Sequence, residues 1–304
     1  MNVYSTSGPM NIIRPETDFE ASFLSAKVVG SKICYKVVDE INESVALNIS
    51  LVDVGSSWVK LKKGVASLKI LPHDFEKSSY ILRVTLDALS IKNGCLPLHA
   101  ASIRTRKKTI ILFADSFCGK STIMYHYCNK FSSTPIGDDH LVIKGDHIVG
   151  NSIARIRGPY SEERFIAREL VIQPFSEYSI FVVRLSDKNS CDKTCESDFF
   201  QKYNYQKCVL RYFGSALIEN GQEIPLSELV DIPLMASYQN RFAKFVAESN
   251  GIYFLSGSID FILEEIGRIL SKNSEIRREK LQDKIKNFQL SRSNLSLRKV
   301  SSTC

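Results

Sequence analysis

The stretch that decides the fold is residues 112–122, which reads LFADSFCGKST. It joins an apolar strand end to a turn that closes on Gly-Lys-Ser-Thr, and it follows the phosphate-loop pattern G-x-x-x-x-G-K-[ST]. In that pattern backbone N–H groups surround phosphate oxygens, the Lys reaches the terminal phosphates and the hydroxyl residue holds Mg²⁺. Ala114 stands where the pattern has its first Gly, and the other positions match. The stretch therefore predicts a nucleotide-binding turn between a strand and a helix.

The start of the predicted helix supplies the chemistry of this turn. Free backbone N–H groups and the positive end of the helix dipole meet at one point, which suits a polyphosphate. The residues expected to surround the nucleotide are Ala114, Ser116, Cys118, Gly119, Lys120, Ser121 and Thr122. A helix that merely begins after a Gly is the alternative, because the first Gly is missing and Phe117 is large for a tight loop.

Two adjacent acidic residues follow the loop. Asp138 and Asp139 stand eighteen and nineteen positions after Lys120, at the end of a short apolar and turn-forming stretch. Because adjacent residues at a strand end point in opposite directions, one carboxylate can hold Mg²⁺ while the other faces an acceptor hydroxyl. An ordinary Gly-Asp-Asp turn is the alternative.

One histidine precedes the loop by a single strand. His99 lies in the stretch LPLHAA at residues 96–101. A lone His among apolar residues is more often a core or hairpin residue than a catalyst. His99 can reach the phosphate loop only if the order and curvature of the sheet bring it there, and spacing leaves this open.

Residues 20–75 indicate a small antiparallel β domain, because short β-branched and aromatic runs alternate with turn signals. The runs are 23–29, 33–38, 45–54, 58–61 and 66–71. The apolar spacing then changes and predicts a helix over 78–92 that ends at Asn93-Gly94.

From residue 96 the pattern alternates between strands and helices, which predicts an α/β region, α+β over the whole chain. Strands are expected at 97–103, 109–114, 179–185 and 251–255, with a hairpin over 140–149 that turns at 144–146. Helices are expected at 120–129 and 258–270, and residues 199–213 can form another. The polar segment 186–198 is expected to be a loop.

The chain is divided accordingly into a β-rich N-terminal domain (1–77), a phosphate-loop domain (78–270) and a basic, Ser-rich tail (271–304). The tail has nine Lys or Arg against three acidic residues, so it holds +6 of the net charge of +7. Contact with nucleic acid or a membrane surface would depend on the tail alone, and we expect no specific nucleic-acid function.

The remaining composition points to a cytoplasmic protein without a membrane span. No run of 18 or more apolar residues occurs, and the first residues do not resemble a secretion signal. Eight cysteines at irregular spacing favour reduced thiols, and the spacing of Cys191 and Cys195 lacks the second ligand pair of a zinc site.

Three motifs in order then resemble one family. They are LHAAS at 98–102, ADSFCGKST at 114–122 and GDD at 137–139. This set resembles the catalytic domain of HPr kinase/phosphorylase and its kinase-like relatives, whose phosphate-loop core is shared with the ATP-type phosphoenolpyruvate carboxykinases. The resemblance covers about residues 78–270 and is strongest over 96–142.

The resemblance implies an ATP- and Mg²⁺-dependent kinase that transfers the γ-phosphate to a hydroxyl. Lys120 would contact the β and γ phosphates, Ser121 would ligate Mg²⁺ together with Asp139, and Thr122 would assist at the helix start. Asp138 would take the proton from the acceptor hydroxyl, with His99 beside it. The roles within the Asp pair can be exchanged. Since members of the family form rings, self-association is a further expectation.

One departure suggests a divergent relative. The bifunctional HPr enzymes have a Glu two positions before an Arg-Gly, whereas the nearest match here, Arg157-Gly158, has Arg155 in that place. The chain looks closer to relatives that phosphorylate peptides, so Ser or Thr of a peptide or protein is the expected acceptor. The alternatives are a non-catalytic nucleotide- or peptide-binding module and a small-molecule kinase. Arg157 is the cation we favour for neutralising transition-state charge.

Overall fold

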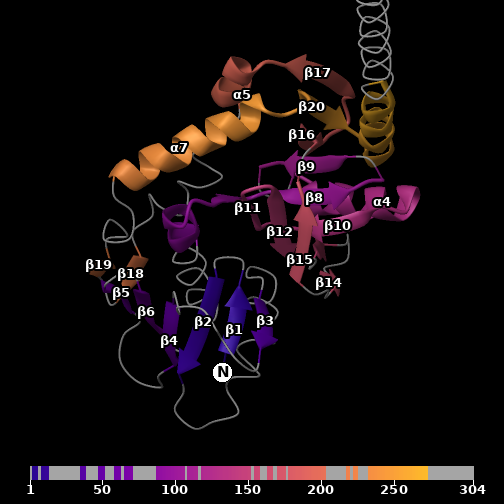
Figure 1. Ribbon diagram of the computed structural model, residues 1–304. Coiled ribbons are helices and arrows are strands. Elements are labelled where there is room, and N and C mark those ends of the chain that lie inside the picture. The colour runs from indigo at the N-terminus through magenta and orange to yellow at the C-terminus, as the bar shows by residue number, and fades with distance from the viewer. Residues whose placement is uncertain are drawn as a thin grey trace, which may run out of the picture.

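The structure of the 304-residue chain is a computed structural model (Figure 1). It describes residues 2–5, 8–13, 35–38, 47–51, 58–62, 65–70, 87–106, 108–115, 118–151, 154–157, 163–166, 170–175, 177–202, 217–219, 222–224 and 232–272. Side-chain surroundings are described for residues 87–106, 108–115, 118–150, 172–175, 177–200 and 233–272.

Six strands from the first 70 residues form one mixed sheet. They are β1 (Asn2–Ser5), β2 (Gly8–Ile13), β3 (Tyr35–Val38), β4 (Leu47–Leu51), β5 (Trp58–Lys62) and β6 (Val65–Ile70), in the order β3-β1-β2-β4-β6-β5. The predicted all-antiparallel pairing is wrong, because β4 runs parallel to both β2 and β6. Alternation of side chains marks a strand but not its direction, so pattern reading could not show this. The strand expected at 23–29 lies outside the described residues.

A second six-stranded sheet occupies the middle of the chain. Its strands are β8 (Ala101–Arg104), β9 (Thr109–Phe113), β10 (Thr134–Gly137), β16 (Tyr178–Leu185), β17 (Ser190–Thr194) and β20 (Ile252–Gly257), in the order β10-β8-β9-β16-β20-β17. The three central strands β9, β16 and β20 are parallel, and the outer ones pair antiparallel. Strands buried on both faces read as continuous apolar runs, as β9 does with its sequence TIILF.

Helices cover both faces of this sheet (Figure 1). α4 (Lys120–Phe131) and the helix at 259–272 pack on the face that includes Ile110, Leu112 and Phe181. α7 (Ile232–Ala247) and α5 (Glu196–Lys202) pack on the opposite face, with Ile111 and Phe113. Alternate residues of β9 thus enter two separate apolar cores, which fixes the register of the strand.

A smaller sheet shares the apolar core on the face that α7 and α5 cover. It contains β7 (Leu96–Leu98), β11 (Leu141–Lys144), β12 (His147–Asn151) and β15 (Leu170–Pro174), in the order β15-β12-β11-β7. The hairpin predicted over 140–149 is confirmed as β11 and β12, which turn at Gly145-Asp146. Two small hairpins complete the described strands: β13 (Ala154–Arg157) with β14 (Glu163–Ile166), and β18 (Leu217–Glu219) with β19 (Gln222–Ile224).

The prediction of a single strand over 97–103 is wrong. The chain breaks at His99-Ala100, so that β7 pairs with β11 in the smaller sheet and β8 pairs with β9 and β10 in the larger one. Pro97 has no N–H for a sheet ladder, and β7 is accordingly an edge strand. His99 therefore lies at the junction of two sheets.

The prediction of a loop over the segment 186–198 is also wrong. It contains the edge strand β17 and the beginning of α5. An edge strand with polar, mostly exposed side chains shows no apolar alternation, so its sequence resembles a loop. The helix considered at 199–213 begins earlier, at Glu196, and residues 203–213 lie outside the described part of the chain.

The predicted α/β class is confirmed by this mixture of sheets and helices. The helices expected at 120–129 and 258–270 and the strands expected at 109–114, 179–185 and 251–255 are present within a few residues of their predicted bounds. Of the helix expected at 78–92, residues 87–92 are described and helical. No described helix has the length and apolar character needed to cross a bilayer.

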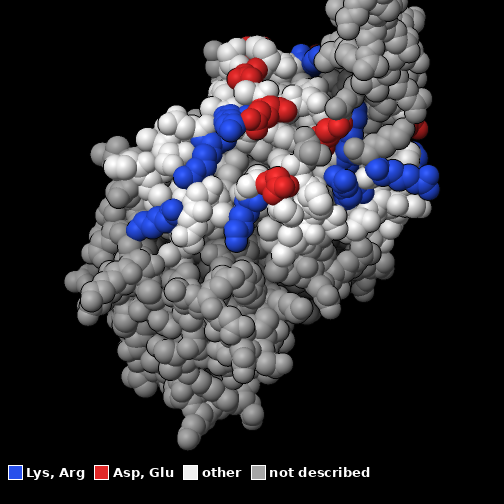
Figure 2. All heavy atoms as spheres, in the orientation of Figure 1, with Lys and Arg blue, Asp and Glu red and all other residues white. Residues whose placement is uncertain are grey.

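The division into domains at residues 77 and 270 stays a prediction. Of the basic tail, only residues 271–272 belong to the described part, and both are helical. On the face shown in Figure 2, acidic and basic side chains of the described residues lie next to one another.

Candidate active site

The strand-turn-helix unit expected around Gly119 is present. β9 ends at Phe113 and α4 begins at Lys120. Within the turn the Cys118 N–H donates to the Asp115 carbonyl at 3.1 Å, and the Ile123 N–H donates to the Gly119 carbonyl at 2.8 Å as the helix starts. Ser116 lies outside the described residues.

Gly119 is required at its position for two independent reasons. Its φ of 98° lies in the left-handed region, which other residues adopt only with strain. A Cβ there would also lie 2.5 Å from Cγ and Cδ1 of Leu185, at the end of β16. The Leu185 N–H donates to the Cys118 carbonyl at 3.1 Å, so β16 holds the turn from the side. Only a residue without a side chain lets the turn and β16 approach this closely.

A second turn carries the acidic pair. β10 ends at Gly137, and the His140 N–H donates to the Asp138 carbonyl at 2.7 Å across Asp139, whose φ is 60°. A hydrogen bond between residues two apart with a positive φ between them is a γ-turn, which is rare and strained. Strained backbone of this kind persists only where the surroundings hold it, and it is concentrated at functional sites.

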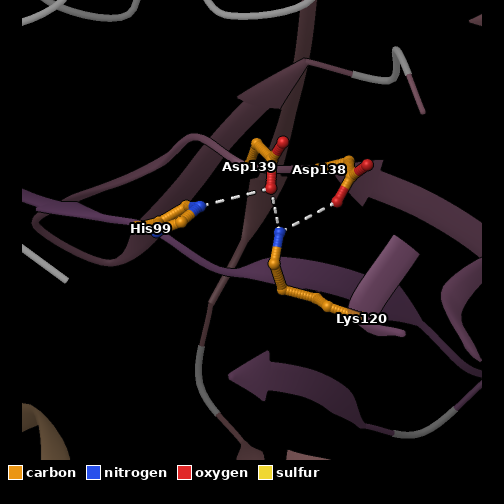
Figure 3. Close-up of polar contacts among 4 residues, drawn as sticks. All are labelled: His99, Lys120, Asp138 and Asp139. Atoms are coloured by element: carbon orange, nitrogen blue, oxygen red, sulfur yellow. Dashed lines mark hydrogen bonds and ion pairs between the residues drawn. The ribbon is translucent and has the colours of Figure 1, made fainter. Parts of the chain in front are cut away.

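The two turns meet through Lys120. Its ammonium donates to Asp138 Oδ1 at 3.2 Å and also to Asp139 Oδ1. His99 Nε2 lies 3.3 Å from Asp139 Oδ1 on the other side (Figure 3). Hydrogen bonding from the Ser121 hydroxyl acts to lower the pKa of the Asp138 carboxyl group. Five residues predicted from three separate sequence segments therefore form one polar cluster.

The other predicted loop residues surround this cluster less directly. Ala114 is buried in the apolar core on the α4 side of the sheet, and Cys118 is half-buried against the same core. Thr122 is half-buried on the first turn of α4. Arg155 and Arg157 lie in β13, which runs beside α4, and their side chains are outside the described part of the structure.

Burial and neighbouring charges shift the pKa values of the groups in the cluster in different directions. Burial lowers the pKa of Lys120, but the neighbouring carboxylates Asp138 and Asp139 outweigh it and raise that pKa above its usual value. Burial raises the pKa of Asp138, which is 1% exposed. Burial also opposes ionisation of Asp139, yet Lys120 and then His99 hold its pKa well below the usual range. Two adjacent carboxyl groups thus differ in proton affinity, as in acid-base pairs of enzymes.

The donor atoms of the cluster fit a magnesium nucleotide. Carboxylate and hydroxyl oxygens are the ligands that Mg²⁺ prefers, and one or two protein carboxylates suffice when phosphates supply the rest. Lys120 and the first turn of α4 provide the positive charge and N–H groups that phosphates require. Among the described residues, no three His, Cys, Asp or Glu gather closely enough to hold a metal by themselves.

Sequence reasoning missed two residues next to the cluster. His140 directly follows the acidic pair, and its Nε2 lies 2.7 Å from Oδ1 of Asp87, with both side chains buried. The two positions are 53 residues apart, and no motif joins them.

Five cysteines belong to the part with described side chains, and all five are free thiols.

The comparisons with known proteins are sparse. The sequence matches no protein-family profile, and no curated protein matches it significantly. Among solved structures, the chain is similar to the Hpr(Ser) kinase/phosphatase from Coxiella burnetii, with 11% identity and a TM-score of 0.21 over 50% of this chain and 98% of that one. This is a distant structural relationship.

Proposed function

We propose that the chain is an ATP- and Mg²⁺-dependent phosphotransferase that acts on a hydroxyl group. The observation that supports it is the position of Lys120, which begins α4 and directs its ammonium between the carboxylates of Asp138 and Asp139. Phosphoryl transfer needs positioned phosphates, neutralised charge and a base near the nucleophile. The cluster has a group for each of these needs.

Each residue has one role in this proposal. Lys120 leaves its carboxylate partners to bind the β and γ phosphates, whose charge replaces theirs, and the N–H groups of the first turn of α4 bind phosphate oxygens. Asp139 and Ser121 would hold Mg²⁺, which supplies neutralising charge between phosphates. His99, 3.3 Å from Asp139, keeps that carboxylate oriented and ionised.

Asp138 is the proposed base because burial raises its pKa, and a carboxylate with a higher pKa accepts a proton more readily. The acceptor hydroxyl gives its proton to Asp138, and its oxygen forms a bond to the γ-phosphorus. The bond between that phosphorus and the β–γ bridging oxygen breaks, and ADP leaves with the electron pair. The product is a phosphate monoester.

The expected acceptor is Ser or Thr of a peptide or protein, as the resemblance of the three motifs to peptide-phosphorylating relatives implies. A small-molecule hydroxyl uses the same machinery and is the alternative acceptor. Self-association is part of the proposal only through the same resemblance.

Two conservative variants test the proposal. Calorimetry measures ATP binding with Mg²⁺ and with EDTA, and ADP release is followed in the presence of a Ser- and Thr-containing peptide library. Asp138→Asn should keep Mg²⁺-ATP binding and lose about 100-fold or more of transfer. Asp139→Asn should lose the Mg²⁺-dependent part of the affinity. If the two variants behave the other way round, the roles of the carboxylates are exchanged. Absence of ATP binding by the wild-type chain would refute the proposal.

A non-catalytic binding module is the second candidate. Ala114 in place of the first loop Gly favours it, because the replaced residue is one that phosphate loops normally use. This module would bind Mg²⁺-ATP in calorimetry and release no ADP above the level of the Asp138→Asn variant.

A further inference from the structure

The γ-turn at Asp138-Asp139-His140 is held at both of its ends. Before the turn, Gly137 packs so closely against Gly150 of β12 that a Cβ on Gly150 would lie 3.0 Å from the Gly137 Cα and 2.6 Å from the Ile136 carbonyl oxygen. After the turn, the His140 ring is 1% exposed and bonds to Asp87. A strained segment between two fixed ends has little freedom to relax.

The two ends are held by different kinds of contact. The Gly137–Gly150 contact is steric, and it comes from the neighbouring strand β12. The His140–Asp87 contact is a 2.7 Å hydrogen bond between an imidazole and a carboxyl group, and it comes from the helix at 87–92. A hydrogen bond with an ionisable partner is short and directional, so it fixes the ring position more narrowly than packing does. His140 Nδ1 is buried and has no partner among the described groups, so the ring is held through Nε2.

We propose that Asp87 is a positioning residue of the site: through His140 it holds the strained turn in the conformation that directs Asp138 and Asp139 toward Lys120. The effect of Asp87 on metal binding and transfer rests on the proposed function, whereas its effect on the conformation of the turn does not. Asp87 acts on the reacting groups only through His140 and the turn. Removal of a group that supports the ligands of a metal typically changes metal affinity or activity by about 10- to 100-fold.

His99 offers a reporter for the turn that needs no ligand. Its Nε2 lies 3.3 Å from Asp139 Oδ1, so its ring resonances depend on where that carboxylate stands. The chain has five histidines, and His99→Gln and His140→Gln variants identify the two signals of interest in a ¹H–¹⁵N spectrum of the full-length protein.

The test compares Asp87→Ala with Asp87→Asn and with a matched control. Asp87→Ala should shift both the His140 and the His99 signals, whereas Asp87→Asn keeps an acceptor oxygen and should restore the His99 signal. Tyr178→Phe removes a different buried hydrogen bond, from the Tyr178 hydroxyl to the Phe245 carbonyl, and should leave His99 unchanged. If Asp87→Ala does not fold, Asp87→Ser carries the same expectation, because its hydroxyl is too short to reach the ring.

Two results would overturn the inference. One is an Asp87→Ala or Asp87→Ser protein with a wild-type His99 signal, because the turn would then stand without Asp87. The other is an equal His99 shift in Asp87→Asn and Asp87→Ala, which would assign the effect to lost charge and not to position.

Calorimetry separates this inference from the proposed function. If the wild-type chain binds Mg²⁺-ATP, Asp87→Ala should weaken that binding by about 10- to 100-fold and leave ATP affinity in EDTA unchanged. Equal weakening under both conditions would contradict positioning of the metal-binding carboxylate. If the wild-type chain binds no ATP, the proposed function fails, and the histidine spectra still decide the role of Asp87.

Discussion

The Lys120 ammonium and the Asp138 carboxylate lie 3.2 Å apart with side-chain exposures of only 7% and 1%. Charges this deeply buried are costly when alone, and the removal of one partner leaves the other unpaired. Since Lys120 also contacts Asp139, three charged groups stabilise one another across the two turns. The cluster therefore matters for folding as well as for the proposed chemistry, and the two contributions need separate measurements.

Lys120→Met is expected to lower the free energy of unfolding by about 3–5 kcal/mol, because it leaves Asp138 buried without its cation. Urea unfolding followed by circular dichroism measures this loss. Lys130→Met is the matched control, because Lys130 makes an exposed ion pair with Glu264 at 3.8 Å. That variant should lose less than about 1 kcal/mol. Equal losses in the two variants would mean that the buried ion pair stabilises the fold no more than the exposed one does.

Gly119→Ala is expected to destabilise the chain more than Gly94→Ala does. Both glycines have positive φ, 98° and 81°, so each alanine adds about 1–2 kcal/mol of backbone strain. A Cβ at Gly94 meets nothing within 4 Å, whereas at Gly119 it meets Leu185 at 2.5 Å and adds about 1–3 kcal/mol of overpacking. Thermal unfolding of both variants measures the difference.

The Leu185→Ala background separates the two costs at Gly119. In that background the contact with Leu185 is removed, so Gly119→Ala should cost only the backbone strain that Gly94→Ala shows. If Gly119→Ala destabilises the Leu185→Ala protein as much as it does the wild type, the steric clash lies elsewhere in the turn.

His99→Asn is expected to reduce the Mg²⁺-dependent ATP affinity or the transfer rate by about 10- to 100-fold, because the carboxylate of Asp139 loses the partner that orients it. His126→Asn is the control: His126 is exposed on α4 and should change neither quantity. Calorimetry and ADP release measure both variants. Identical behaviour of the two would remove His99 from the site.

The local elements were predictable because their signals are local. α4 and the hairpin β11–β12 each follow from a turn next to a periodic apolar pattern. No helix is predicted from the sequence at α7, although α7 buries Tyr238 and Phe242 in the core. Its aromatic side chains have lower intrinsic helix propensity than Ala or Leu, whereas the proline in its first turn is compatible with a helix.

Long-range pairing explains the rest of the difference between sequence and structure. The break at His99 depends on β7 and β8 joining different sheets, which no property of residues 97–103 alone determines. The candidate site shows the same division. Lys120, Ser121 and the Asp pair stand in recognisable motifs, whereas Asp87 reaches His140 across 53 residues and shares no motif with it. Motifs thus identified the groups proposed for chemistry and His99 beside them, whereas only the fold identified the Asp87–His140 pair.

The chain is expected to lose stability steeply in alkali. Burial first, and then the negative charge of a neighbouring Cys128 thiolate, raise the pKa of Tyr127 to about 12, from an ordinary value near 10. A group whose folded pKa is raised stabilises the fold below its unfolded pKa and loses that contribution as pH rises through the folded value. Urea midpoints measured between about pH 9 and 12 should therefore fall, and Tyr127→Phe should remove about 1–3 kcal/mol of that fall. Lys120, whose pKa is also raised, contributes in the same direction. An alkaline profile of Tyr127→Phe that follows the wild type would show that ionisation of Tyr127 is not coupled to unfolding.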